Sequence, residues 1–476
     1  MTLVAELERA VGADAVISEA SQMRTYECDG LTGHRAMPEA VVLPRTTEQV
    51  QAAVRVCHAR GIPFVARGAG TGLSGGAVPV AEGIVIGLAR MNRILEVDVP
   101  NRRARVQPGV ANLDVTSAVA AHGLYYAPDP SSQQVCTIGG NVAENSGGAH
   151  CLKYGFTTNH VLELEIVLAD GELVRIDRAG GLDLLGGFVG SEGTLGIATE
   201  IVVTLLPRPQ RVETLLAAFE TTDAAGEVVS AIIAAGIVPA AIEMMDALTI
   251  RAAEAAVGAG LPLDAGAVLI VELDGPAAEV EVTLARVLEC CALGLATEVR
   301  VAATQAERAA FWRGRKAAFA AMGRISPDYY VQDGVVPRTR LPETLRRIRA
   351  LSESHGLEVG NVFHAGDGNL HPLVLYDGAV AGQAERAEEL AGAILQACVD
   401  AGGSLTGEHG IGLDKACHMP LMYSPDDLAT MLRLRTAFDP DGLCNPGKAF
   451  PTPRLCGEVP GPYRRHPAER EGVERW

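Results

Sequence analysis

A glycine-dense loop that follows a short apolar strand constrains the fold more than any other feature of this 476-residue sequence. Residues 63–66 are expected to form a strand, and residues 67–76 contain five glycines and two hydroxyl side chains. Glycine permits tight turns and lets successive backbone N–H groups point at one anion, so the loop has the chemistry of a pyrophosphate cradle. The dinucleotide-binding fingerprint is not matched, because no GxGxxG opens a long helix here. For this loop alone, a flexible connector is the alternative.

Three further segments, 128–132, 137–148 and 190–197, also offer small residues and amide donors. The sequence from 128 to 155 reads as irregular backbone, and such a length is unusual in a compact domain unless it serves a site. Taken together, the four segments resemble the FAD-binding domain of the vanillyl alcohol oxidase and p-cresol methylhydroxylase (PCMH) family, over about residues 38–206. The resemblance implies that these loops hold FAD without a Rossmann fold.

The same resemblance assigns individual residues to the pyrophosphate, the ribityl chain and the isoalloxazine ring. They are Arg67, Gly68, Ala69, Gly70, Thr71, Gly72, Leu73, Ser74, Pro128, Asp129, Ser131, Thr137, Gly139, Gly140, Asn141, Asn145, Gly148, Glu192, Gly193, Gly196 and Ile197. Some family members attach FAD through a histidine of the first loop. This loop has no histidine, so noncovalent FAD is expected, with a link at His150 or Cys151 as the alternative.

Domain limits follow from the proline-flanked segment 207–209, which is typical of a boundary. After residue 212, strands and helices alternate in a way that favours a helix-covered antiparallel sheet of ferredoxin-like type. The predicted fold class is therefore α+β, with a two-subdomain PCMH-type FAD-binding domain and a ferredoxin-like C-terminal substrate (cap) domain. The predicted limits are an N-terminal helical segment at 1–37, the FAD-binding domain at 38–209, the substrate domain at 210–455 and a polar tail at 456–476.

Two histidines in the second domain form a candidate metal site. If Asp367-Gly368 is a two-residue hairpin turn, His364 stands directly opposite His371, close enough to share one ion. Glu408 would complete a His, His, carboxylate set that leaves coordination positions open for a substrate. His409, next to it, is then available as a base. A simple glycine-rich turn is the alternative for Glu408 and His409.

These motifs resemble the C-terminal domain of FAD-linked oxidases that act on D-2-hydroxy acids, over about residues 212–451. That group includes the flavin subunit of glycolate oxidase and FAD-linked D-lactate dehydrogenases. The resemblance implies that Asn445 returns to the flavin and that Arg315 clamps the substrate carboxylate, with Arg313 as the alternative. Zinc is the expected metal, with manganese or iron as alternatives. Leu373 replaces an asparagine of the family's 2-hydroxyglutarate dehydrogenases, which favours glycolate or D-lactate over a dicarboxylate.

The implied reaction is the oxidation of the 2-hydroxy acid to a 2-oxo acid. Arg315 holds the carboxylate, the metal polarises the hydroxyl, His409 removes its proton, and the Cα hydride passes to flavin N5. For this, the metal ligands must converge beside the isoalloxazine ring. The sequence has no iron–sulfur ligand pattern, so electrons would reach a non-NAD acceptor through partners, a second FAD-fold subunit and an iron–sulfur subunit. The rival hypotheses are a non-redox flavoprotein, like the ether-lipid synthase of the superfamily, and a non-catalytic scaffold subunit.

Composition excludes several other classes of function. The net charge of −18 argues against a nucleic-acid partner. Ten cysteines at irregular spacings indicate reduced thiols and a cytoplasmic location. The N-terminus carries charges where a signal peptide needs an apolar core, and the longest apolar stretch, 228–245, contains a glycine and a proline. Any membrane contact is therefore expected to be peripheral, at the inner face and through partners.

Overall fold

The computed structural model describes residues 1–179, 181–451 and 474–475, and these residues form two compact units. Unit 1 consists of Met1–Gly147, Phe156–Arg208 and the chain from Glu408 onward. Unit 2 consists of Gly148–Gly155 and Pro209–Gly407. The chain therefore passes between the units at four places. The structure groups the segment after Gly407 with unit 1, whereas the predicted substrate domain extends to residue 455. The predicted tail, 456–476, lies outside the described residues except for 474–475.

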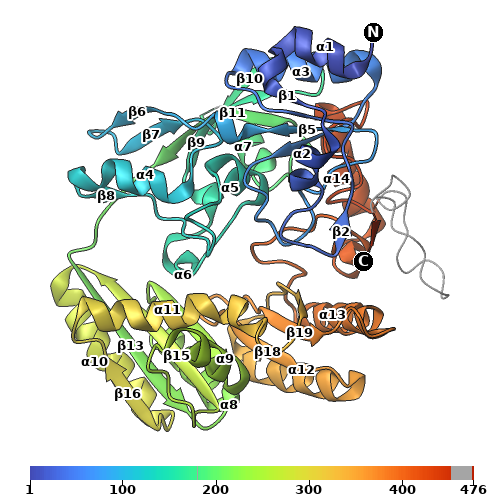
Figure 1. The fold of residues 1–476 in the computed structure, drawn as a ribbon. Coiled ribbons are helices and arrows are strands. Elements are labelled where there is room, and N and C mark those ends of the chain that lie inside the picture. Colours follow the sequence, from blue (N-terminus) through green and yellow to red (C-terminus); the bar gives the residue numbers. More distant parts are fainter. Residues whose placement is uncertain (180, 452–473, 476) are drawn as a thin grey trace. The chain divides into compact units, whose positions relative to one another are not determined.

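Unit 1 is built on two sheets, each with its own apolar cluster (Figure 1). The first sheet has the strand order β1-β3-β5-β4, with β3, β5 and β4 parallel. The second is antiparallel, in the order β10-β9-β11-β7-β6. The predicted two-subdomain architecture is thus confirmed. The strands are β1 Val16–Ile17, β2 His34–Arg35, β3 Ala40–Val42, β4 Phe64–Arg67, β5 Ile84–Gly87, β6 Ile94–Asp98, β7 Arg103–Val106, β8 Leu124–Tyr125, β9 Val161–Val167, β10 Leu173–Asp177, β11 Ile197–Thr204, β12 Leu206–Pro207 and β20 Glu474–Arg475.

The helices of unit 1 begin and end at local sequence signals. In α3, Thr46 Oγ1 accepts a hydrogen bond from the backbone N–H of Gln49 at 3.3 Å, and Gly61 ends the helix in the left-handed conformation. The α-helices are α1 Leu3–Val11, α2 Ala20–Met23, α3 Thr47–Arg60, α4 Asn112–Val119, α5 Ile138–Glu144, α7 Leu184–Phe188 and α14 Pro425–Phe438. Short 3₁₀ helices are η1 Ala13–Ala15, η2 Arg24–Tyr26, η3 Leu88–Arg90, η4 Ala120–His122, η5 Thr157–Asn159 and η7 Ala416–Leu421.

The predicted irregular stretch from 128 to 155 is wrong in part, because it contains α5 and, in unit 2, α6 Cys151–Tyr154. Thr137 Oγ1 caps α5 by accepting from the backbone N–H of Gly140, and Asn145 ends the helix with a φ of 51°. Two glycines early in α5 lower its helix propensity and conceal it in the sequence. The loop is therefore more rigid than its composition indicates.

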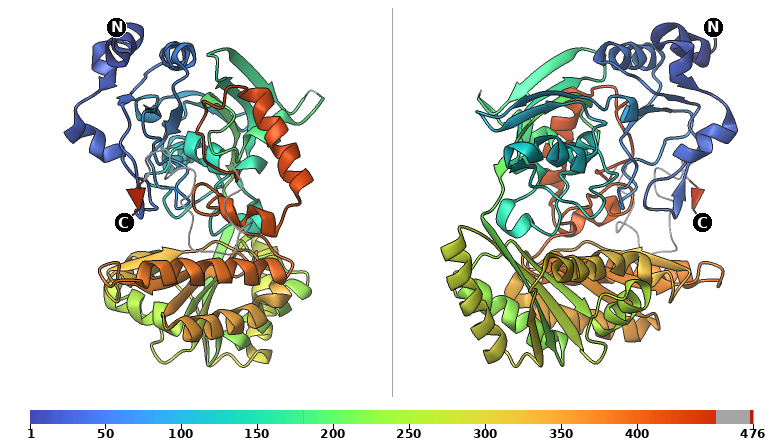
Figure 2. Two further views of the ribbon diagram at one scale, coloured as in Figure 1. Left: turned by 90° about the vertical axis from the view of Figure 1, so that its right-hand side faces the viewer. Right: turned by 60° about the vertical axis from the view of Figure 1, so that its left-hand side comes forward.

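Unit 2 contains one seven-stranded sheet in which each strand pairs antiparallel to its neighbours, in the order β16-β13-β15-β14-β18-β19-β17 (Figure 2). In chain order its first four strands are arranged 4-1-3-2, with α8 and α10 as the crossovers. This is the ferredoxin-like arrangement, as predicted. The strands are β13 Arg211–Phe219, β14 Ala241–Asp246, β15 Ala267–Gly275, β16 Glu298–Val301, β17 Asp328–Val331, β18 Val359–His364 and β19 Pro372–Tyr376. The helices are α8 Thr222–Ala234, α9 Ala247–Val257, α10 Ala277–Leu293, α11 Gln305–Met322, η6 Arg338–Arg340, α12 Leu341–His355 and α13 Gln383–Asp400.

The two faces of this sheet carry separate apolar clusters. One cluster contains residues of α8, α10, α12 and α13, and the other contains residues of α9 and α11. Because side chains alternate along a strand, Met244 of β14 belongs to the first cluster and Met245 to the second. Glu243 shares a face with Met245, so a carboxylate stands in the middle of the sheet on the α11 face. No helix among the described residues is both long enough and apolar enough to cross a membrane.

Candidate functional site

The first glycine loop of unit 1 offers a row of backbone donors. Within the described residues, none of the N–H groups from Ala69 to Gly76 donates a hydrogen bond to a protein acceptor. Most residues of this loop are half-buried or buried. Buried backbone donors are nearly always paired. A row of this length without protein acceptors therefore indicates a ligand that accepts hydrogen bonds. A pyrophosphate has this chemistry.

Side chains and glycines around the loop agree with this reading. The hydroxyls of Ser74 and Ser191 are buried and have no hydrogen-bond partner in the described structure. A Cβ added at Gly72 or Gly193 would meet no atom closer than 3.9 or 3.8 Å, respectively, so space remains above both backbones. The first and fourth predicted segments therefore form a cradle that fits the phosphates of FAD.

Two residues that the sequence assigned to the flavin also hold the loops in place. Arg67 Nη1 donates to the carbonyls of Cys28 at 2.7 Å and of Ala77 at 3.3 Å. Asn141 Oδ1 accepts a bond from Asn112 Nδ2 at 3.0 Å. Of the other predicted flavin residues, Gly148 alone lies in unit 2. The remainder lie in unit 1: Gly68, Ala69, Gly70, Thr71, Gly72, Leu73, Ser74, Pro128, Asp129, Ser131, Thr137, Gly139, Gly140, Asn145, Glu192, Gly193, Gly196, Ile197 and Asn445.

Asn445 joins segments that are far apart in the sequence. Its Nδ2 donates to the carbonyl of Gly76 at 2.8 Å and to that of Glu192 at 2.6 Å. The side chain is almost fully buried, and its Oδ1 accepts from Lys448 Nζ at 3.0 Å. The C-terminal segment thus fixes the first and fourth loops to each other. This role differs from the predicted contact with the flavin, which stays a prediction.

Asp29, which the sequence did not single out, anchors the end of the first loop. Its Oδ2 accepts from the N–H of Ala77 at 3.1 Å, and its Oδ1 accepts from that of Leu31 at 2.9 Å. Burial raises the pKa of this carboxyl to about 6, although the two N–H groups oppose the shift. An ionised Asp29 is therefore less favourable in the folded protein than in the unfolded chain.

A pH titration of stability tests this arrangement. A carboxyl whose pKa is raised on folding stabilises below its unfolded pKa, and this contribution is lost as the pH rises through the folded value. Between about pH 4 and pH 7, the wild type should therefore lose about 3 kcal/mol of unfolding free energy relative to Asp29→Asn. Urea unfolding of both proteins across this range measures the difference. Parallel pH profiles of the two proteins would contradict the assignment.

In unit 2, the hairpin that carries the two histidines has a different register from the predicted one. His364 pairs with Asn369 and Asn361 pairs with Pro372, so His364 does not stand directly opposite His371. The turn is longer than Asp367-Gly368, because Gly368 donates its N–H back to the His364 carbonyl at 3.2 Å. The prediction was wrong by two residues, and a shift of two keeps a side chain on the same face of a strand. The two imidazole rings therefore still meet, with centroids 5.0 Å apart at an angle of 82°.

Glu243 connects the first histidine to the predicted substrate arginine, and the sequence prediction missed it. Its Oε1 lies 2.7 Å from His364 Nδ1, and its Oε2 lies 2.7 Å from Arg315 Nη2. All three side chains are buried. Burial raises the pKa of Glu243, but the charges of His364 and Arg315 oppose this effect. The net pKa of Glu243 is therefore below its ordinary value. A glutamate inside the apolar run 241–245 was the signal that could have revealed it.

The two arginine candidates face in opposite directions on α11. Arg315 is 3 % exposed, whereas Arg313 is exposed to solvent. The ion pair with Glu243 uses Nη2 of Arg315, whereas its Nε is buried and has no hydrogen-bond partner in the described structure. The structure therefore brings Arg315, and not Arg313, to the pair formed by Glu243 and His364.

Asp333 is a second carboxylate that the sequence prediction missed. It is fully buried, with its Oδ1 3.6 Å from His371 Nε2, and its backbone carbonyl accepts from the N–H of Gly407 at 2.9 Å. Gly407 is the last residue of unit 2, and Glu408 is the next residue of the chain. The Cα atoms of two consecutive residues lie about 3.8 Å apart. Glu408 and His409 belong to unit 1, where Glu408 Oε1 lies 3.9 Å from His409 Nε2.

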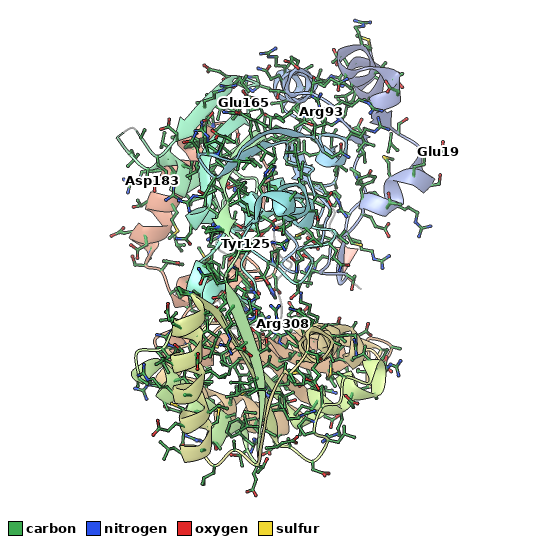
Figure 3. The ribbon with its side chains drawn as sticks, turned by 90° about the vertical axis from the view of Figure 1, so that its left-hand side faces the viewer. Glu19, Arg93, Tyr125, Glu165, Asp183 and Arg308 are labelled. Carbon is green, nitrogen blue, oxygen red and sulfur yellow. The ribbon has the colours of Figure 1, made fainter. Side chains whose placement is uncertain are left out.

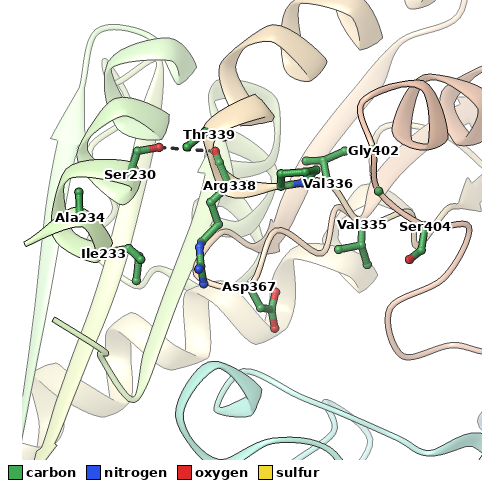
Figure 4. A pocket seen from close by; sticks show the side chains of 12 residues that line it. Ser230, Ile233, Ala234, Val335, Val336, Arg338, Thr339, Asp367, Gly402 and Ser404 are labelled. Carbon is green, nitrogen blue, oxygen red and sulfur yellow. Dashed lines mark hydrogen bonds between the residues drawn. The ribbon is translucent and has the colours of Figure 1, made fainter. Parts of the chain in front are cut away.

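Two other polar features of unit 2 lie outside this constellation. Glu272 of β15 is buried and accepts from Arg308, labelled in Figure 3, at 2.8 and 3.0 Å, and its Oε1 lies 3.1 Å from His150 Nε2. This carboxylate anchors the segment 148–155 to the sheet. Figure 4 shows a pocket beside the hairpin turn, with Arg338 and Asp367 on its wall, but neither histidine lines it.

Comparisons with known proteins agree with both halves of the chain. Residues 38–177 match the family model described as "FAD binding domain", and residues 208–449 match "FAD linked oxidases, C-terminal domain". The chain is 52% identical to glycolate oxidase subunit GlcD of Escherichia coli (strain K12), over 93% of this chain and 89% of that protein. It is 34% identical to a D-lactate dehydrogenase of Archaeoglobus fulgidus, over 94% and 99%. The fold is similar to p-cresol methylhydroxylase with substrate bound, with a TM-score of 0.78 at 18% identity, over 94% and 96%.

Proposed function

Because the chain belongs to the family of FAD-linked oxidases, we propose that it oxidises a small D-2-hydroxy acid, glycolate or D-lactate, to the 2-oxo acid. Noncovalent FAD is the proposed cofactor, held by the glycine loops of unit 1. The observation that carries the substrate class is Glu243, which ties an imidazole and a buried guanidinium together on one face of the sheet. When bound, FAD supplies the hydride acceptor and a divalent cation supplies a Lewis acid.

His364, His371 and Glu408 are the proposed ligands of the divalent cation, for which zinc is the first candidate and manganese or iron are the alternatives. Nδ1 of His364 is directed at Glu243, and Nε2 is the proposed ligand atom. A carboxylate on the other ring nitrogen orients a ligating histidine and raises its basicity. His409 follows Glu408 directly in the chain, and we propose that it takes the proton of the substrate hydroxyl.

Arg315 is the proposed partner of the substrate carboxylate. Glu243 fixes one side of the guanidinium, while the buried Nε is available for an anion. Leu373 supports a short substrate, because it lies fully buried in the apolar cluster on the α11 face and offers no hydrogen bond to a second carboxylate. A dicarboxylate would leave its distal charge without a partner there.

Electrons are proposed to leave through other proteins. The Escherichia coli relative is named as a subunit of glycolate oxidase, which supports a multi-subunit assembly. A second FAD-fold subunit and an iron–sulfur subunit are the proposed partners, in the cytoplasm and at the inner face of the membrane. Purification of the complex with a tagged form of this chain would identify them.

Anaerobic reduction of the bound flavin tests the proposal. Glycolate or D-lactate should bleach the visible absorbance of the flavin, while D-2-hydroxyglutarate should reduce it much more slowly. Removing the metal with a chelator should slow reduction by about a hundredfold or more, because a Lewis acid contributes several kcal/mol to the transition state. If no 2-hydroxy acid bleaches the flavin, the chain is a non-redox or scaffold flavoprotein.

A further inference from the structure

Glu192 lies in the fourth glycine segment of unit 1, yet its carboxylate is directed at the loop that follows Glu408 and His409. Oε1 accepts from the backbone N–H of Ile411 and Oε2 from that of Gly412, both at 2.7 Å. The side chain is 5 % exposed. Two charge-assisted bonds to adjacent N–H groups are strong enough to set the path of a glycine-rich loop.

The backbone N–H and carbonyl of Glu192 are also hydrogen-bonded. Its N–H donates to the carbonyl of Ala143 in α5 at 2.8 Å, and its own carbonyl accepts from Asn445 Nδ2 at 2.6 Å. The residue also has a φ of 54°, which is uncommon outside glycine. Such a conformation persists only where the surroundings over-determine it. Glu192 thus connects α5, the fourth segment and the C-terminal segment to one loop.

The same loop is held from its other side. Lys415, which is 1 % exposed, donates from Nζ to the carbonyl of Gly410 at 3.0 Å. Gly410 has a φ of 85°, and a Cβ there would lie 2.6 Å from Glu144 Oε2 and 2.9 Å from Glu192 Oε1. Only glycine fits at this position, because two carboxyl groups close around it. The loop is therefore held through the N–H groups of Ile411 and Gly412 and through the carbonyl of Gly410.

Glu192 and the neighbouring Glu144 are buried carboxyl groups, and both have raised pKa values. Burial raises the pKa of Glu192, although the N–H groups of Ile411 and Gly412 and the nearby Lys415 and Lys448 oppose the shift. The pKa of the neighbouring Glu144 is raised well above its ordinary value, first by burial and then by the charge of Glu192. Of the two carboxyl groups, Glu192 is the one that accepts the N–H groups of Ile411 and Gly412.

From these contacts we propose that Glu192 is a positioning residue that couples occupancy of the flavin loops to the placement of Glu408 and His409. When FAD binds, the fourth segment becomes fixed. Because Glu192 accepts the N–H groups of Ile411 and Gly412, these residues, three and four positions after Glu408, become fixed with it. The chain thereby assembles its metal ligand and base only around a bound cofactor. The catalytic consequence rests on the function proposed above, whereas the coupling itself does not.

Hydrogen exchange of the full chain, with and without FAD, tests the coupling without any substrate. In the wild type, FAD should slow exchange of the Ile411 and Gly412 amides by about tenfold or more. In Glu192→Gln this protection by FAD should disappear, because an amide cannot accept both N–H groups and its NH₂ faces one of them. Glu200→Gln, on β11 of the same unit, is the matched control and should behave as the wild type.

Kinetics of the holoenzyme give a second readout. A loop displaced by about 1 Å should lower kcat of Glu192→Gln by about a hundredfold with KM almost unchanged, while FAD stays bound. Glu192→Asp keeps the charge and should recover part of this loss. If Glu192→Gln does not fold, Gly410→Ala disturbs the same loop from its other side and should give the same faster exchange.

Equal protection by FAD in the wild type and in Glu192→Gln overturns the proposal, as does a wild type whose loop exchanges equally fast with and without FAD. A loss of kcat that Glu192→Asp and Glu200→Gln share also overturns it, because the cause is then a general loss of stability. If the exchange results hold while no 2-hydroxy acid reduces the flavin, the coupling stands and the proposed substrate class is wrong.

Discussion

Replacing His409 by alanine is expected to slow anaerobic flavin reduction by glycolate or D-lactate by about 10²- to 10⁴-fold, the usual contribution of a positioned general base. The imidazole is the proposed acceptor of the hydroxyl proton, and alanine leaves no group to take it. Bound FAD should remain at the wild-type level, because the flavin loops do not depend on this side chain. Stopped-flow absorbance of the flavin measures the rate.

His122→Ala is the matched control, since this histidine lies on η4 of the same unit and is exposed. It should reduce its flavin at the wild-type rate. A His409→Ala protein that keeps both its flavin and full turnover would remove the base from the mechanism. The proton of the substrate hydroxyl would then need another acceptor.

Glu243→Gln is expected to weaken binding of the divalent cation by about 10- to 100-fold, although Glu243 is not itself a proposed ligand. An amide can no longer serve His364 as a charged acceptor, and a carboxylate that hydrogen-bonds a ligating histidine typically contributes that factor. Glu243→Ala should also lower the unfolding free energy by about 3–5 kcal/mol, because it leaves the buried guanidinium of Arg315 without a counter-charge. Competition with a zinc chelator and urea unfolding measure the two effects.

Glu272→Gln separates the two effects, because Glu272 is also a buried glutamate of this sheet that pairs with an arginine, Arg308. The variant should lose stability but keep its metal affinity. Equal metal affinities for Glu243→Gln and the wild type would mean that His364 does not ligate through its second ring nitrogen. The proposed metal site would then lose its main support.

The fold was predictable to the level of its class. Alternating strands and helices after residue 212 predicted the ferredoxin-like sheet, and the glycine segments predicted a two-subdomain flavin domain; the structure and the comparisons confirm both. The extension of the sheet by β18, β19 and β17 was not predicted. Strand order depends on pairings between residues distant in the sequence, and no local pattern specifies them.

For the candidate site, the sequence provided residue types but not their partners. The glycines and the two histidines are visible as motifs, because each brings its chemistry within a short window of sequence. The hairpin register was missed by two residues, since the turn also includes Ala365 and Gly366 and closes through the His364 carbonyl.

What the sequence by itself determined is the chemical inventory: a phosphate-binding set of loops, two imidazoles on one face of a hairpin, and an arginine on a helix. Tertiary structure alone decided what each charge faces. Glu243 meets His364 and Arg315 across strands and a helix, and Glu192 reaches a loop more than two hundred residues away. A buried charge is stable only beside the partners that folding brings to it, so its role is not encoded in its neighbours along the chain.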